Sequence, residues 1–276
     1  MKNILSIDVE DYFMVSAFAD KIPFDSWNQY ESRVVMNTEI LLSLLQKFKV
    51  KATFFVLGWV AEKFPTLVKK INHDGHEIAS HGYAHELLYL QKPDKFTLDL
   101  RKSKTILEDI TGDSVLGYRA PSYSFTKKTL WVLDILIDMG FKYDSSVFPI
   151  HHDRGGLPHA NRFPYSLHAN NGEILEFPLS TIRLLGNNIP VAGGGYFRLF
   201  PYFFISQSIR AINREGQPAI LYFHPWEIDP QQPKISSSKF NEFRHYNNLD
   251  QAEKKLKRLL GEFEFTSIRD VIESGN

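Results

Sequence analysis

The sequence predicts a single α/β domain over residues 1–276, built on a parallel β-sheet. Short apolar, β-rich runs alternate along the chain with longer stretches in which apolar residues recur at helical spacing. Repeated strand–helix units of this kind favour a parallel sheet, either closed as a barrel or doubly wound. With 276 residues, 43% of them hydrophobic, the chain can bury a sizeable core, and no repeat or low-complexity linker interrupts it.

The strands are predicted from short runs that are mostly apolar and rich in β-branched or aromatic residues. The first is NILSIDV, and the run PAILYFH near the C-terminus is the most apolar. In order, the predicted strands lie at residues 3–9, 51–57, 76–81, 115–120, 141–145, 173–180, 218–224 and 262–266.

The helices are predicted from apolar periodicity together with start and stop signals. Residues 37–48 place apolar side chains on one face, with Asn37 as the expected N-cap. Residues 64–75 carry Pro65 near the first turn and Gly75 at the end. Residues 149–171 are loop-like because they are rich in Gly and Pro. The other predicted helices lie at residues 94–110, 127–140, 202–216 and 248–261.

Composition excludes several classes of function and site. Lys plus Arg equals Asp plus Glu at 32 each, and no basic run suggests a nucleic-acid partner. The chain has no cysteine, so a metal can be held only by His, Asp and Glu. The N-terminal run is broken by acidic residues and does not read as a signal peptide, and no transmembrane segment is predicted, so the expected location is the cytoplasm. The oligomeric state cannot be read.

Ionisable residues follow several predicted strands at the point where each strand ends. In parallel α/β folds the carboxyl ends of the strands form the functional rim, so these side chains are expected to converge there. The residues are Asp8 and Glu10 after the first strand, His81 after the third, and Arg119, Asp144 and His224 after later ones.

The spacing His81-x3-His85 suits two imidazoles approaching one cation. With a carboxylate from the first strand they make a set of two histidines and one carboxylate, which leaves a coordination position open. His73 lies at the polar end of a helix and His76 at the start of a strand, so both are expected to be structural.

Five motifs resemble, in order, those of the polysaccharide deacetylase family, the NodB-homology carbohydrate esterases. They are SIDVEDYF, SHGYAH, YRAPSYS, YDSSVFP and LYFHPWE. The C-terminal stretch also resembles the subfamily associated with exosortase-type exopolysaccharide loci. The resemblance implies a distorted (β/α) barrel of about seven strands, with residues 225–276 as a subfamily-specific segment packed on it.

The same resemblance implies metal-dependent removal of N-acetyl groups from N-acetylhexosamine units of a glycan. Asp8 would be the general base, and His81 and His85 would be metal ligands. Arg119 would hold Asp8 ionised and oriented. The backbone N–H of Ser122 would help to stabilise the oxyanion.

His224 would protonate the leaving amine, with Asp144 positioning and charging it. An amide needs an activated water, an oxyanion site and an acid, so the chemistry agrees with these roles.

The first motif departs from the family pattern, in which two aspartates are adjacent. Asp8 and Glu10 share a face if the chain stays extended, which favours Glu10 as the third metal ligand, with Asp11 as the alternative. Ser122 replaces a common aromatic residue, and the usual tryptophan after Asp144 is missing.

Aromatic residues near the motifs are candidates for stacking on sugar rings. Tyr123, Trp226 and Tyr83 are the expected substrate-binding residues, and Trp59 is a weaker candidate. A second, less favoured group that can reach the site from the C-terminal segment is Arg244, His245 and Tyr246.

Three other functions remain open. A hydrolase of cyclic imides or allantoin shares the barrel, as does an O-acetyl esterase, and a catalytically silent glycan-binding module belongs to a different class. The complete set of base, ligands, Arg and acid argues against the silent module. The expected cofactor is one divalent metal: Zn²⁺ fits the ligands, and Co²⁺, Ni²⁺, Mn²⁺ and Fe²⁺ remain alternatives.

Overall fold

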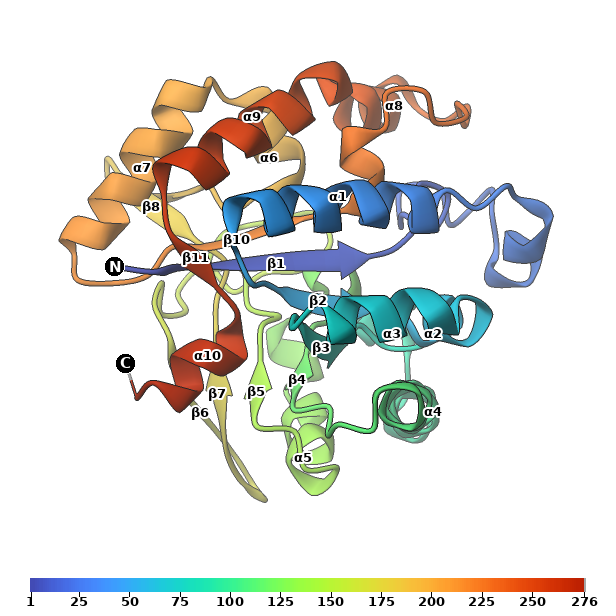
Figure 1. The fold of residues 1–276 in the computed structure, drawn as a ribbon. Helices are drawn as coiled ribbons and strands as arrows, with labels where there is room; N and C mark the ends of the chain where they lie inside the picture. The colour runs from blue at the N-terminus through green and yellow to red at the C-terminus, as the bar shows by residue number, and fades with distance from the viewer. Residues whose placement is uncertain (276) are drawn as a thin grey trace. The chain divides into compact units, whose positions relative to one another are not determined.

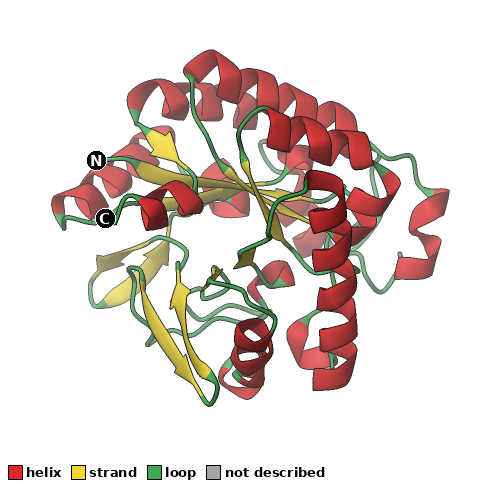
Figure 2. Cartoon of the chain, turned by 60° about the horizontal axis from the view of Figure 1, so that its bottom comes forward, coloured by secondary structure: helices red, strands yellow, loops and turns green. Residues whose placement is uncertain are grey.

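The computed structural model describes residues 1–275, and the mixed α/β class predicted from the sequence is confirmed (Figure 1 and Figure 2). Its internal contacts group the chain into two compact units, which we describe separately. The N/C unit comprises Met1–Thr53 and Val191–Asn276, and the middle unit comprises Phe54–Pro190. The expected single domain over the whole chain stays a prediction. Among the described residues, no helix combines the length and the apolar character needed to cross a bilayer.

The N/C unit is organised around β1 (Asn3–Val9), in which every residue is buried. Ile4 is paired in parallel both with Ile220 of β10 (Ile220–Phe223) and with Thr266 of β11 (Phe265–Thr266), so these partners occupy opposite edges of β1 (Figure 1). β1 is paired on both edges and has no exposed residue, so its three polar side chains (Asn3, Ser6 and Asp8) are buried together with four apolar ones.

Helices supply the rest of the N/C unit, and α1 contacts α9 there. The prediction that Asn37 is the N-cap of the first helix is wrong, because α1 begins three residues earlier and Asn37 is buried inside it. The helices are α1 (Val34–Phe48), α6 (Gly194–Leu199), α7 (Tyr202–Arg214), α8 (Lys239–Tyr246), α9 (Leu249–Glu262) and α10 (Ile268–Glu273), with short 3-10 turns η1 (Phe24–Gln29) and η5 (Pro225–Ile228).

The middle unit contains a parallel ladder in the order β3 (Glu77–Ser80), β4 (Gly117–Tyr118), β5 (Tyr143–Asp144) and β7 (Gly172–Glu176). β2 (Thr53–Val56), which begins at the last residue of the N/C unit's first segment, neighbours β3. The helices of this unit are α2 (Gly58–Lys63), α3 (Pro65–His73), α4 (Pro93–Thr111) and α5 (Trp131–Asp138), with short 3-10 turns η2 (Leu88–Leu90), η3 (Pro121–Tyr123) and η4 (Lys127–Thr129).

Two hairpins in the middle unit correct the sequence analysis. β6 (Tyr165–Ala169) lies within the stretch expected to be a loop and pairs antiparallel with β7. The separate pair β8 (Thr181–Leu184) and β9 (Asn187–Pro190) was not predicted. Residues of β6 alternate between half-buried and exposed, so this strand carries little of the apolar signal by which buried strands are recognised.

Candidate functional site

The predicted strand-end residues lie where the sequence placed them. Asp8 is the penultimate residue of β1, Asp144 is the last of β5, and the other four follow their strands directly. Those four are Glu10 after β1, His81 after β3, Arg119 after β4 and His224 after β10.

The N/C unit holds an acid cluster, which we define as Asp8, Glu10, His224 and Glu227. The register between β1 and β10 ends at the pair Ile7–Phe223, so Asp8 and His224 are the next residues of adjacent parallel strands. The three carboxylates are almost fully buried. The backbone N–H of Glu10 donates to the carbonyl of Asp8 (3.0 Å), because the chain turns as β1 ends.

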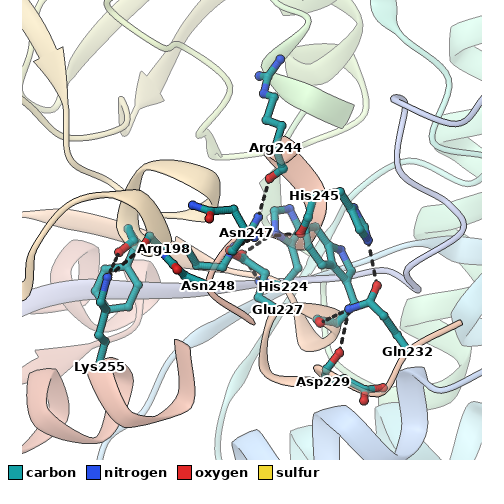
Figure 3. Close-up of polar contacts among 12 residues, drawn as sticks. Arg198, His224, Glu227, Asp229, Gln232, Arg244, His245, Asn247, Asn248 and Lys255 are labelled. Carbon is teal, nitrogen blue, oxygen red and sulfur yellow. Dashed lines mark hydrogen bonds and ion pairs between the residues drawn. The ribbon is translucent and has the colours of Figure 1, made fainter. Parts of the chain in front are cut away.

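His224 is held between two carboxylates. Its Nδ1 lies 2.7 Å from Oε1 of Glu227 (Figure 3). Its Nε2 lies 3.2 Å from Oε1 of Glu10. The backbone N–H of His224 also donates to Oε1 of Glu227 (3.0 Å), at the start of η5. Sequence reasoning missed Glu227, although its place one helical turn after the histidine was a usable signal.

Burial disfavours the charged imidazolium and alone would lower the pKa of His224. The Glu10 charge, the hydrogen bond and charge of Glu227, and the charge of Asp8 outweigh burial and raise the pKa of His224 to about 9. This side chain is therefore protonated at neutral pH and able to act as an acid.

Trp226 lies between two imidazole rings. It stacks on His224 with centroids 5.0 Å apart and on His245 with centroids 4.2 Å apart. Its indole Nε1 donates to Oε1 of Glu10 (3.3 Å). Both faces of the indole are occupied, so Trp226 has no open face for the sugar stacking that the sequence suggested; it supports His224 and Glu10 instead.

The C-terminal segment contributes structure to this unit. Nε2 of His245 lies 2.7 Å from Oε1 of Gln232, and burial lowers the pKa of His245 to about 3, so this imidazole is neutral. The hydroxyl of Tyr246 accepts from the backbone N–H of Ile235 (2.6 Å). The carbonyl of Arg244 accepts from the guanidinium of Arg198 (3.0 Å).

Asp11, the alternative metal ligand, caps the first helix. Its Oδ2 accepts from the backbone N–H groups of Arg33 (2.8 Å) and Val34 (3.0 Å) and from the hydroxyl of Ser32 (2.6 Å). Its Oδ1 accepts from the N–H of Tyr12 (2.9 Å). These four bonds engage both oxygens in holding the start of α1, so Glu10 is the better candidate ligand.

The middle unit holds a histidine cluster, which we define as His81 and His85. The ring centroids are 5.3 Å apart. Nδ1 of His81 lies 2.8 Å from the carbonyl of Arg119, a bond that fixes the ring and directs Nε2 away from it. His85 has a left-handed backbone (φ 53°). Such strain concentrates at functional sites, where it aims a side chain.

Asp99 on α4 organises the turn between the two histidines. Its carboxylate accepts from the backbone N–H groups of Tyr83 (2.8 Å) and Ala84 (3.2 Å). Lys102 lies over the Tyr83 ring at 3.6 Å from its centroid, and the Tyr83 hydroxyl donates to Glu62 (2.5 Å). One face of this expected substrate-binding ring is therefore taken. Sequence reasoning also missed Asp99, whose partners lie 15 and 16 residues away.

Ser122 and Tyr123 both have left-handed backbones, with φ of 51° and 54°. Two consecutive non-glycine residues in this region carry a strain of about 1–3 kcal/mol each, which the fold must offset. Tyr123 is buried against Phe148, with centroids 5.7 Å apart. The strained turn directly follows Pro121, and it is where the sequence predicts an N–H donor for an oxyanion.

Arg119 is fully buried and fixed by its neighbours in the middle unit. Nε donates to the carbonyl of Ser145 (3.0 Å) and Nη2 to its hydroxyl (2.8 Å), while the guanidinium lies 4.0 Å from the centroid of Phe55. These contacts orient the guanidinium without neutralising its charge.

Asp144 is paired with Glu176, which it faces across the β5–β7 ladder. Burial raises the pKa of Asp144 to about 6, although hydrogen bonds from Glu176 and Ser146 lower it. Burial and the charge of Asp144 hold the pKa of Glu176 well above its usual range. Glu176 is thus the partner that holds a proton. The carboxylate on Nδ1 of His224 is Glu227, so the positioning role expected of Asp144 stays a prediction.

The donor types of Glu10, His81 and His85 fit a divalent metal. One carboxylate and two imidazoles are the set used by open zinc sites, and all three residues are buried. His81 has the second contact, from Nδ1 to a backbone carbonyl, that orients ligating imidazoles.

Two family models match the chain in succession. Residues 22–143 match polysaccharide deacetylase, and residues 145–273 match a domain of unknown function, DUF3473. Less than half of the chain is thus similar to polysaccharide deacetylases. The deacetylase match contains His81, His85 and Arg119, whereas His224 and Glu227 fall in the DUF3473 match, which is consistent with the exopolysaccharide-associated subfamily.

Curated relatives match part of this chain over part of their own length. The chain is 36% identical over 113 residues to a peptidoglycan deacetylase of Helicobacter pylori, and 39% identical over 84 residues to a peptidoglycan-N-acetylglucosamine deacetylase of Bacillus cereus. These matches cover 41% and 30% of this chain. The chain spans about a third of these relatives, 37% and 30% of their lengths.

Solved structures share the fold of this chain over nearly all of its length. A candidate polysaccharide deacetylase of Mycobacterium smegmatis has a TM-score of 0.61 at 20% identity, covering 98% of this chain and 88% of its own. The Puue allantoinase has a TM-score of 0.62 at 15% identity, covering 97% and 87%. At these identities the likeness shows the fold alone.

Proposed function

We propose that this chain is a metal-dependent hydrolase that removes N-acetyl groups from N-acetylhexosamine units of a polysaccharide or its precursor. The observation that carries the proposal is His224, a protonated imidazole whose Nδ1 is held by Glu227 and whose Nε2 points toward Glu10. Amide hydrolysis needs a proton donor for a poor leaving amine, beside a site that activates water. The deacetylase-domain match and the printed activities of the curated relatives support this choice of substrate class.

In this proposal Glu10, His81 and His85 hold one divalent metal, with Zn²⁺ the best fit to the donor set. When bound there, the ion supplies an acidified water and polarises the acetyl carbonyl. Asp11 takes no part, because its oxygens cap α1.

The chain's own residues would then perform the proton transfers. Asp8 takes a proton from the attacking water, and Arg119 keeps that carboxylate ionised and oriented. The backbone N–H of Ser122 donates to the developing oxyanion, and His224 gives the proton on Nε2 to the leaving nitrogen. A base and an acid from separate strands supply both transfers that an amide requires.

From the subfamily resemblance, the proposed substrate is an exopolysaccharide precursor that contains N-acetylated sugars. The proposed location of the reaction is the cytoplasm or the inner membrane surface. Recovery of the mature protein from the periplasm would contradict that location.

The test is acetate release from N-acetylglucosamine oligomers by Zn²⁺-loaded protein, beside Asp8→Asn and His81→Ala. His73→Ala is the matched control, because His73 is an exposed histidine outside the cluster. Activity that requires metal, disappears in both site variants and survives in the control supports the proposal. Release of acetate from O-acetylated sugars alone, or hydrolysis of cyclic imides alone, would replace it with the corresponding hydrolase.

A further inference from the structure

His224 is the end of a buried chain of polar groups that begins at Arg198. Nε of Arg198 donates to Oε2 of Glu227 (2.8 Å), and the other oxygen of Glu227 contacts Nδ1 of His224 (2.7 Å) (Figure 3). Arg198 and Glu227 are 2% and 0% exposed. A carboxylate with no access to water is stable as an anion only when charged or hydrogen-bonding groups face it, and Glu227 has both.

The remaining donors of Arg198 bind the turn between α8 and α9. Nη1 donates to the carbonyls of His245 and Asn247, each at 2.8 Å, and Nη2 donates to the carbonyl of Arg244 (3.0 Å) (Figure 3). One guanidinium thus joins Glu227 to three carbonyls of residues 244–247. A lysine cannot replace it, since an ammonium has three donors and no planar fork.

The backbone of Arg198 is also fixed from this side of the unit. Nζ of Lys255 on α9 donates to the carbonyls of Arg198 (2.8 Å) and Phe200 (2.9 Å), and Nδ2 of Asn248 donates to the carbonyl of Arg198 (3.1 Å) (Figure 3). The C-terminal segment therefore holds both the guanidinium and the backbone carbonyl of Arg198. A fixed Arg198 in turn fixes the Glu227 carboxylate that it binds.

We propose that Glu227 and Arg198 are positioning residues that hold the catalytic acid His224 in place, and that residues 244–255 contribute by holding Arg198. This inference rests on the proposed function. It gives a role to the part of the chain that matches the domain of unknown function: that part fixes which nitrogen of the acid carries the transferable proton.

The chemical argument is that Glu227 can only accept a hydrogen bond. Its 2.7 Å contact therefore directs the N–H of Nδ1 toward Glu227, which leaves Nε2 as the nitrogen on the side of Glu10. Glu10 offers a competing acceptor at Nε2, but the 2.7 Å contact to Glu227 is shorter than the 3.2 Å contact to Glu10.

Glu227→Gln is the decisive variant, because it keeps the size of the side chain and removes its charge. Arg198 and the backbone N–H of His224 can both only donate, so one of them must meet the amide N–H₂. We expect the charged guanidinium to take the amide oxygen, because a hydrogen bond from a charged donor is the stronger one, and the N–H₂ then faces His224. A neutral imidazole then accepts at Nδ1 and carries its proton on Nε2. The tautomer should therefore switch.

The first measurement is the ¹⁵N spectrum of His224 in the full-length, metal-free chain at a pH where the ring is neutral, assigned by its loss in His224→Gln. We expect the Nδ1–H tautomer in wild type and the Nε2–H tautomer in Glu227→Gln. The second is kinetics of the Zn²⁺-loaded protein, for which we expect kcat to fall about 100-fold, within the range for loss of general acid catalysis, and KM to change less than threefold.

Glu262→Gln is the matched control, since Glu262 also binds an arginine (Arg210, 2.8 Å) in the same unit. It should keep both the tautomer and kcat. An unchanged tautomer in Glu227→Gln, or a kcat no lower than that of the control, would overturn the proposal.

Arg198→Lys keeps the test decisive if Glu227→Gln does not fold. We expect faster hydrogen exchange in residues 244–248 together with a fall in kcat of about tenfold, as for a residue one contact removed from the reacting group. Faster hydrogen exchange in residues 244–248 with an unchanged kcat would overturn the proposal that Arg198 acts through Glu227 on His224. If wild type releases no acetate from any glycan, the proposed function fails, whereas the tautomer result still decides the positioning role.

Discussion

Removing the Asp11 carboxylate should lower the free energy of unfolding and leave the metal affinity unchanged. Removing the Glu10 carboxylate should lower the metal affinity and leave the free energy of unfolding nearly unchanged. The two acidic residues are adjacent, and the first motif alone leaves either as the ligand. The structure separates them, since Asp11 accepts four hydrogen bonds at the start of α1 while Glu10 contacts His224 and Trp226.

The size of the effect follows from those four bonds. A hydrogen bond contributes about 1 kcal/mol net, so Asp11→Ala should lower the free energy of unfolding by about 4 kcal/mol. That exceeds the cost of about 0.5–2 kcal/mol for losing one helix cap, because the bonds from Tyr12 and Ser32 are lost as well. For a chain of this size it corresponds to a fall in Tm of roughly 8–16 °C.

The assay pairs urea unfolding with a calorimetric Zn²⁺ titration of each full-length variant. Asp11→Asn should lose about 1 kcal/mol, because its oxygen can keep the three bonds of Oδ2 and only the bond from Tyr12 is lost, and it should bind Zn²⁺ with the wild-type Kd. Glu10→Gln should keep its urea midpoint within about 1 kcal/mol and lose at least about 100-fold in affinity, at the upper end of what an outer contact is worth. Weakened binding in Asp11→Asn with an unchanged midpoint would refute the assignment.

Three other outcomes follow from the geometry. Glu176 holds a proton in the folded chain, and the unfolded chain releases that proton above the ordinary pKa of glutamate, so this residue makes stability fall as pH rises. Glu176→Gln should reduce the pH dependence of the free energy of unfolding, measured by urea, by up to about 1.4 kcal/mol per pH unit. The same pH dependence in wild type and variant would contradict the raised pKa. Removing the metal with a chelator should lower the Tm of wild type but not of His81→Ala, because a metal present at 100 times its Kd adds about 2.7 kcal/mol to the stability of the folded chain. Equal falls in Tm for the two proteins would place the metal elsewhere. Trp226→Ala should cost about 3–5 kcal/mol in urea unfolding, through the space left between two imidazoles, and Trp226→Phe clearly less; equal losses would show that ring packing is not what matters there.

The residues that lie at strand ends were predictable from the sequence, because the signal is local. A buried apolar run that stops at an ionisable residue marks both the strand and its end, as at His224 after β10 and His81 after β3. The fold class follows from the same alternation of strands and helices.

The residues that the sequence did not reveal depend on partners far along the chain. The cap of α1 comes from Asp11, 23 residues before Val34, so Asn37 looked like the start of the helix. Glu227 stands in a quoted motif, but Arg198, which keeps it ionised, lies 29 residues away and has no pattern linking it to His224. Long-range pairs of this kind leave no periodicity to read.

The pairing of β1 has a consequence for how the chain is made. Its neighbours β10 and β11 lie more than 200 residues later, so the strand that carries Asp8 leaves the ribosome long before either partner exists. At bacterial and eukaryotic synthesis rates, roughly 10–50 s pass between the synthesis of Val9 and that of Phe265. The whole middle unit is synthesised within that interval. Of the neighbours of β1 in the sheet, β2 is made early and β10 late, so one edge of β1 stays unpaired over such an interval. An unpaired edge is prone to aggregate, and we expect production of this protein in cells to depend on chaperones that shield residues 3–9.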